Sequence, residues 1–161
     1  MNSLKKYLDK SMEFILVLLM GASVLNVLWQ VITRFLLKNP SSFTEEIARY
    51  LLIWIGLLGA SYGFGKNIHL AIDVLKLRIH DKKRLVVDVL IHVFVFLFAF
   101  IVMIIGGFRL VNLTLELHQI SAALQIKIGY VYLAVPLSGV IMSLYSFMDI
   151  IGLIKTGWRA A

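Results

Sequence analysis

The sequence predicts an all-α integral membrane protein with four transmembrane helices and one amphipathic helix at the membrane surface. Of its 161 residues, 60% are hydrophobic, and the mean hydropathy is +0.90. A soluble domain typically has about 45–50% apolar residues and could not bury this excess. The apolar residues form four long stretches, and a bilayer core about 30 Å thick requires roughly 20 helical residues per crossing. We therefore expect a single membrane domain over residues 1–161, with spans at about 12–37, 45–65, 85–108 and 128–154.

The basic residues predict the orientation of these spans. Eleven Lys and Arg residues flank the spans on one side, and five lie on the other. The richer side holds Lys5, Lys6, Lys10, Lys66, Lys76, Arg78, Lys82, Lys83, Arg84, Lys155 and Arg159, and the poorer side holds Arg34, Lys38, Arg49, Arg109 and Lys127. The positive-inside rule then places both termini in the cytoplasm. The net charge of +7 is thus a topology signal and does not indicate nucleic-acid binding.

The N-terminus has a basic start like that of a signal peptide. Its apolar run exceeds a signal peptide's h-region of about 7–15 residues, and no A-x-A site follows it, so we expect an uncleaved first span. A turn-forming segment, residues 39–42, then precedes the second span. Ser42 and Glu45 have the spacing of a capping box, which predicts that the second span begins there.

Small residues inside the second span predict close packing against another helix. Gly56 and Ala60 are four residues apart, as are Gly59 and Gly63. Such pairs let helices approach closely in lipid, although glycine is also common in membrane helices generally.

The segment of about 67–80 is too charged to cross a bilayer. Ile68, Ile72, Leu75 and Ile79 form one helical stripe, which indicates an amphipathic helix at the inner interface. The same residues partly alternate, so periodicity alone also allows a strand. We expect the helix because the chain contains no other strand that could pair with it.

The third and fourth spans contain few polar residues. Asp88 and His92 are four residues apart in the third span, and a proton relay through them would end about 10 Å into the membrane. Pairing near the interface is therefore the favoured interpretation. Pro136 predicts a kink in the fourth span, and Gly139, Ser143 and Ser146 predict a packing stripe along it.

The charged cluster at the start of the second span admits two interpretations. Arg49 follows Glu45 by four residues and Glu46 by three, so all three side chains can meet on one helix face. In the local interpretation, the glutamates start the helix and neutralise Arg49. In the other, the cluster binds a partner subunit, because charges placed this deep are commonly functional.

We expect neither an enzyme nor a bound cofactor. The chain has no cysteine, and its four histidines form no H-E-x-x-H motif and no pair at matching depths for haem. The segment Gly63–Lys66 lacks the spacing of a phosphate-binding loop. Carriers with their own substrate site usually show inverted repeats and broken helices at mid-membrane, and this chain shows no internal repeat. These observations favour an accessory subunit.

Three motifs, taken in order, resemble the DctQ-like family, the small membrane subunit of tripartite ATP-independent periplasmic (TRAP) transporters. The first is Glu45-Glu46-x-x-Arg49-Tyr50-Leu51-Leu52-x-Trp54, and the second is His69-x-x-x-Asp73. The third is Gln119-x-Ser121-x-x-Leu124-x-Ile126, followed by Tyr132, Pro136 and Gly139. The chain departs from the family at Ala122 and Lys127, where proline is frequent.

The resemblance implies a scaffold for a large membrane subunit that holds the substrate and sodium sites. A periplasmic binding protein would deliver an organic acid of the C4-dicarboxylate or sialic acid type. The residues expected to contact the large subunit are Glu45, Glu46, Arg49, Tyr50, Trp54, Gly59, Gly63, His69, Asp73, Ser121, Tyr132, Pro136 and Gly139.

Two alternatives remain. A membrane anchor of a respiratory or haem enzyme would require His92 and His118 as haem ligands. A small multidrug carrier would require a carboxylate at the middle of the first span, whereas Glu13 lies at its edge.

Overall fold

The computed structural model describes residues 2–39, 41–66 and 81–160, so the amphipathic helix expected at 67–80 lies outside the described residues. None of the described residues belongs to a named strand, and one isolated antiparallel bridge joins Ile120 to Lys127. The elements are α1 (Asn2–Phe35), α2 (Ser42–Gly65), α4 (Asp81–Leu97), the π-helix η1 (Phe98–Gly106), α5 (Gly107–Glu116), α6 (Ile128–Tyr132) and α7 (Ala134–Ala160).

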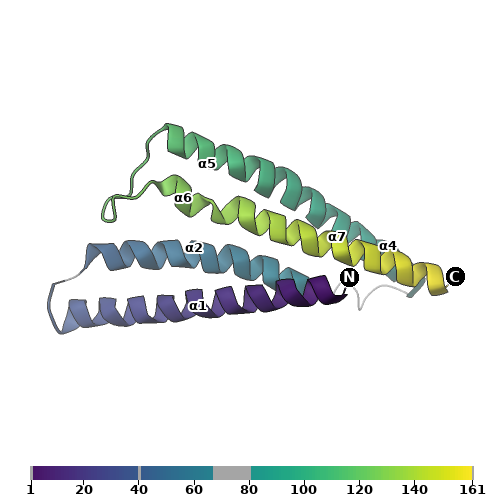
Figure 1. The fold of residues 1–161 in the computed structure, drawn as a ribbon, viewed down its shortest axis with the longest axis horizontal. Helices are drawn as coiled ribbons and strands as arrows, with labels where there is room; N and C mark the ends of the chain where they lie inside the picture. Colours follow the sequence, from purple (N-terminus) through teal and green to yellow (C-terminus); the bar gives the residue numbers. More distant parts are fainter. Residues whose placement is uncertain (1, 40, 67–80, 161) are drawn as a thin grey trace.

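The chain folds into two antiparallel helical hairpins (Figure 1). The first hairpin is α1 with α2. The second pairs the continuous rod α4–η1–α5 with α6–α7. Contacts between α2 and α7 join the two hairpins, so that α7 packs between α2 on one side and α4 and η1 on the other.

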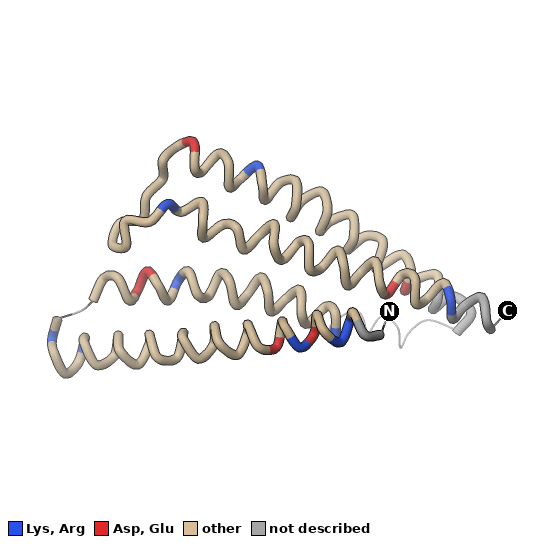
Figure 2. Tube along the Cα trace, viewed as in Figure 1, with Lys and Arg blue, Asp and Glu red and all other residues tan. Residues whose placement is uncertain are grey.

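Four stretches of the described helices are long and apolar enough to cross a membrane: Leu4–Phe35, Ser42–Gly65, Val86–Glu116 and Ile128–Lys155. The predicted all-α, four-span fold is therefore confirmed. Charged residues gather at the two ends of the helices and leave the middle nearly free of them (Figure 2). We call the end with both termini the inner end. The other is the outer end, and residues 117–127 there are called the outer loop.

Two helices extend beyond the expected spans. The helix α1 begins at Asn2 rather than near residue 12, because Lys5 and Asp9 make contacts with other helices that hold its first turns. The third span continues to Glu116 rather than ending near residue 108. Val111 and Thr114 remain buried at helical spacing there, and the Thr114 hydroxyl donates to the Leu110 carbonyl at 2.7 Å.

His118 ends the third span in a left-handed conformation, with φ of 49°. The N–H of Gln119 donates to the Thr114 carbonyl at 3.3 Å, and the N–H of His118 donates to the Leu115 carbonyl at 3.1 Å. This pair of bonds is the Schellman pattern, which satisfies carbonyls that the helix end would otherwise leave unpaired.

The π-helix η1 was not predicted. It faces Gly139 on α7, where an added Cβ would lie 2.7 Å from the Met103 Cβ and 3.1 Å from the Ala99 carbonyl oxygen. The wider turn of η1 thus lies at a close approach of the two backbones. Ala99 and Met103 are buried by this contact, so the third span is not exposed around its whole circumference.

The kink expected from Pro136 is present as a break at Leu133, between α6 and α7. Proline has no N–H, so the carbonyl four residues before it loses its helical donor. Pro136 is fully buried, and an added Cβ on Gly107 would lie 2.9 Å from its Cδ. The break therefore coincides with close packing between α7 and α5.

Candidate functional site

The helix α2 starts without the predicted capping box. Its first residue is Ser42, and its N-cap, Ser41, makes no side-chain capping bond. The prediction that Ser42 and Glu45 would cap each other is wrong, because Ser42 already lies inside the helix. Instead, the Thr44 hydroxyl donates to the Ser41 carbonyl at 2.8 Å, and the Asn26 amide of α1 donates to the Thr44 carbonyl at 2.8 Å.

The two glutamates at the start of α2 point to different surroundings. Glu45 lies 3.4 Å from Arg49, and both side chains are more than half exposed. Glu46 is one residue further along, which turns its side chain by about 100°. No ion pair joins it to Arg49 within the described residues. The expected three-residue cluster therefore divides into an exposed ion pair and a separate carboxylate.

The carboxylate of Glu46 binds the outer loop. Its Oε1 accepts hydrogen bonds from the Tyr50 hydroxyl at 2.9 Å and the Ala122 N–H at 3.2 Å. Its Oε2 accepts from the N–H groups of Ala123 at 3.0 Å and Leu124 at 2.8 Å. Three successive backbone N–H groups of this kind form a concavity suited to an anion. This contact joins the two hairpins at the outer end.

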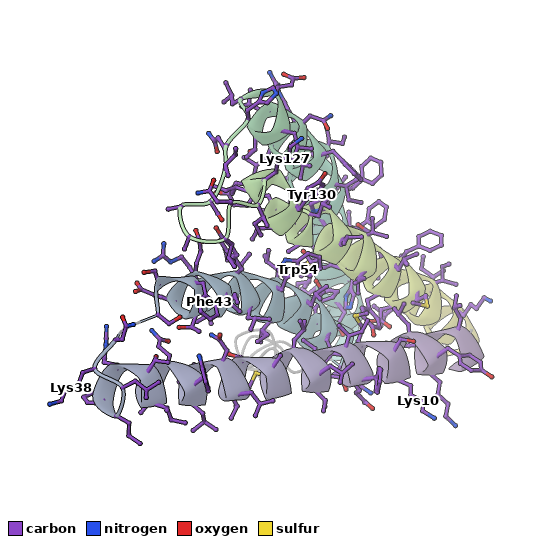
Figure 3. All side chains as sticks on the ribbon, turned by 60° about the vertical axis from the view of Figure 1, so that its left-hand side comes forward. Lys10, Lys38, Phe43, Trp54, Lys127 and Tyr130 are labelled. Carbon is purple, nitrogen blue, oxygen red and sulfur yellow. The ribbon has the colours of Figure 1, made fainter. Side chains whose placement is uncertain are left out.

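An apolar cavity of about 360 Å³ lies beneath this contact. Trp54 lines it from α2 and Tyr130 from α6 (Figure 3), and Tyr50 of α2 also contributes to the lining. The other lining residues are Leu19, Ile47, Leu51, Leu124, Ile126 and Val131. Tyr50 and Trp54, both predicted as subunit contacts, thus line this space, which is largely open to the outside.

The opposite face of α2 is open. Arg49, Leu52, Gly56 and Ala60 are exposed along it at spacings of three and four residues. A Cβ added to Gly56 or Gly63 would meet no other atom within 4 Å. Gly59 alone of the predicted small residues approaches another helix, with an added Cβ 4.0 Å from Leu16. The small-residue pairs therefore do not mediate close packing within this chain.

A network of charged and phenolic side chains closes the inner end. Lys66, which directly follows α2, lies 2.9 Å from the carboxylate of Asp9 and 3.4 Å from that of Glu13, both on α1. The Tyr145 hydroxyl of α7 donates to Asp9 at 2.7 Å. The hydrogen-bonded Asp9 carboxylate raises the pKa of Lys66 above its usual value. Lys66 therefore stays charged throughout the physiological pH range.

Two further contacts extend this network across the hairpins. Lys5 of α1 forms an ion pair with Asp149 of α7 at 2.6 Å. The Tyr62 hydroxyl donates to Glu13 at 2.6 Å. The sequence signal was the spacing of Lys5, Asp9 and Glu13, which places them on one face of α1.

His92 is buried at the edge of this network. Its Nδ1 lies 2.7 Å from the Asp88 backbone carbonyl oxygen, so the two expected partners meet through the backbone of Asp88. Its Nε2 lies 3.8 Å from the Asp149 carboxylate. His118 lies in the outer loop at the opposite end, which excludes these two histidines as ligands of one haem within this chain. The described residues contain no cluster of three His, Cys, Asp or Glu side chains that could hold a metal.

The remaining predicted residues lie at several places. Ser121 is buried in the outer loop, and Tyr132 ends α6 in a half-buried position. Pro136 and Gly139 pack against the third span inside this chain. His69 and Asp73 lie outside the described residues.

Comparison with known proteins matches residues 23–156 to the family model of the DctQ component of tripartite ATP-independent periplasmic transporters. The chain is 29% identical over 157 residues to the sialic acid TRAP transporter small permease protein SiaQ of Vibrio cholerae, covering 96% of this chain and 88% of that protein. It is 29% identical over 118 residues to the C4-dicarboxylate TRAP transporter small permease protein DctQ of Rhodobacter capsulatus, covering 71% and 50%.

A third relative is the sialic acid TRAP transporter permease protein SiaT of Haemophilus influenzae, 28% identical over 96 residues, or 60% of this chain and 16% of that protein. The family model covers most of the chain, and the four apolar helices agree with a multi-pass membrane protein. The chain therefore belongs to the DctQ family, the small membrane component of TRAP transporters, which is a transporter subunit and not an enzyme.

Proposed function

We propose that this chain is the accessory subunit that braces a large membrane subunit during sodium-driven uptake of an organic acid. A periplasmic binding protein would deliver the substrate, and both termini would lie in the cytoplasm of a bacterial inner membrane. Family membership supports the assignment, and so does the match of 96 residues to a small part of the much longer permease SiaT. The sialic acid and C4-dicarboxylate relatives support a carboxylate substrate.

The open face of α2 supports one particular contact surface for the large subunit. It presents small residues, Gly56 and Ala60, to which a helix of another chain could pack closely. Leu52, between Arg49 and Gly56, is 69% exposed and would be covered by the same helix. The first span offers further apolar surface, since its most apolar stretch has no buried residue.

The exposure of Arg49 is the main observation in support of this contact surface. Its guanidinium has one weak ion-pair partner, Glu45, at 3.4 Å, and its side chain is 66% exposed beside the small residues. A helix that covered this face would remove the guanidinium from water, which favours a carboxylate on that helix. Glu46, Tyr50, Pro136 and Gly139 make contacts within this chain, so the proposal does not use them.

Co-purification tests this surface. The large subunit would be co-expressed with this chain, and its recovery would be normalised to the amount of this chain in the membrane. The Arg49→Ala substitution should strand a buried charge on the partner, at a cost of roughly 2–5 kcal/mol, and thereby greatly reduce recovery.

Arg109→Ala is the matched control, because Arg109 is an exposed arginine near the outer end of the other hairpin. It should leave recovery close to that of the unchanged chain. Equal recovery with Arg49→Ala and Arg109→Ala would show that Arg49 has only the local role beside Glu45.

A further inference from the structure

We propose that Glu46 is a conformational latch that holds the outer ends of the two hairpins together and fixes the fold of the outer loop. The proposal is independent of the contact with a large subunit. It rests on the bonds inside the loop, on the hydrogen-bonding capacity of a carboxylate and on the position of the apolar cavity.

Hydrogen bonds within the outer loop join its two sides but do not involve the backbone N–H groups at its tip, residues 122–124. The N–H of Ser121 donates to the Ile126 carbonyl at 2.8 Å, and the N–H of Ile128 donates to the Gln119 carbonyl at 3.0 Å. The turn is closed by Gln125, whose N–H donates to the Ser121 carbonyl at 3.2 Å and whose φ is 56°. These bonds use the two sides of the loop, while the N–H groups of residues 122–124 point to Glu46.

Glu46 supplies all the acceptors that this tip uses. A carboxylate offers about four acceptor sites, two on each oxygen. The three loop N–H groups and the Tyr50 hydroxyl place two donors on each oxygen. Glutamine has the same shape but keeps one acceptor oxygen, and its amide N–H₂ would face N–H donors. Of the two side chains, only the carboxylate therefore offers an acceptor to all four donors from this position.

The position of Glu46 makes this contact a latch. The next hydrogen bond between the hairpins, among the described residues, runs from the Ser61 hydroxyl of α2 to the Ser138 carbonyl of α7, at 3.0 Å. The apolar cavity lies on the outer side of this bond, and Leu124 and Ile126 of the loop form part of its wall. Loss of the Glu46 contact should therefore open the outer end and leave the inner end closed.

Spin-label distances test the latch directly, and the chain's lack of cysteine makes introduced labels unique. One pair, Phe43→Cys with Leu117→Cys, would report the outer end, and a second pair, Tyr7→Cys with Ile154→Cys, the inner end. All four positions are exposed. With Glu46→Gln, the outer distance should lengthen and its distribution broaden, while the inner distance stays unchanged.

Amide hydrogen exchange gives a second readout at residues 122–124. With Glu46→Gln, exchange there should accelerate about tenfold or more, because hydrogen bonds to a charged acceptor are lost. Glu46→Asp should act in the same direction, since its shorter side chain cannot reach all four donors. Glu45→Gln is the matched control and should change neither readout, because Glu45 contacts Arg49 instead.

Unchanged outer distance and unchanged loop exchange in Glu46→Gln would overturn the proposal. A change of the inner distance as large as that of the outer one would also overturn it, because the effect would then be loss of the whole fold.

Discussion

The two ends of the molecule are closed by different chemistry. At the inner end, side chains from α1, α2 and α7 bind one another, through Lys66 with Asp9, Tyr145 with Asp9 and Lys5 with Asp149. At the outer end, the single carboxylate of Glu46 binds backbone N–H groups of a loop. Several side-chain pairs hold the helices together at the inner end, whereas the contact at the outer end depends on one residue.

This difference has a physical reason. The inner end has several charged pairs, so the loss of one partner leaves other contacts in place. Asp9 illustrates this, because it binds both Lys66 and Tyr145. The outer loop carries backbone donors that its own turn leaves without acceptors, and the acceptors they have in this structure come from Glu46. We therefore expect the inner end to tolerate single substitutions of charge, and the outer end to be sensitive at Glu46.

The largest expected effect concerns which end faces the cytoplasm. Single cysteines at Lys10 and Lys155 report the inner end, and single cysteines at Asn39 and Gln119 report the outer end. An impermeant thiol reagent applied to whole cells should label the outer pair and leave the inner pair unlabelled, as the distribution of basic residues predicts. Labelling of the cysteines at positions 10 and 155, with no labelling at positions 39 and 119, would contradict the predicted orientation.

A smaller effect is expected from closing the space at Gly65. An added Cβ there would lie 2.6 Å from the Tyr145 ring, so Gly65→Ala must displace the ring whose hydroxyl binds Asp9. We expect a loss of about 1–3 kcal/mol in the free energy of unfolding in detergent.

Gly63→Ala is the control for this substitution, because an added Cβ at Gly63 meets no atom within 4 Å. It should be neutral, or stabilise the helix by up to about 1 kcal/mol. If Gly65→Ala and Gly63→Ala have the same free energy of unfolding, the packing of Tyr145 does not contribute to closure of the inner end.

The sequence was sufficient to predict the spans but not the contacts between them. A bilayer core imposes a length and a composition on any crossing helix, so hydropathy locates all four. The break near Pro136 followed from its missing N–H. The partners of Lys5 and Tyr145 lie 144 and 136 residues away, at separations for which helical periodicity carries no information.

The role of Glu46 was missed for a different reason. Its partners are backbone N–H groups, which every residue except proline has, so no residue type in the outer loop marks them. Ala122, for example, donates its N–H to Glu46, as almost any other residue at that position could. The capping-box prediction was wrong because it took Ser42 as the N-cap, whereas Ser41 is the N-cap and Ser42 is the first residue of the helix. The π-helix packs against Gly139, a contact that local sequence does not reveal.

Reconstitution into liposomes tests the central claim, that this chain supports a transporter without transporting by itself. The purified chain would be placed in liposomes with a sodium gradient, a radiolabelled sialic acid or C4-dicarboxylate and the corresponding binding protein, with and without the large subunit. The account predicts no uptake above empty liposomes for the chain alone, and uptake when the large subunit is present. Uptake by the chain alone would contradict the account, because it would require a substrate path within these four helices.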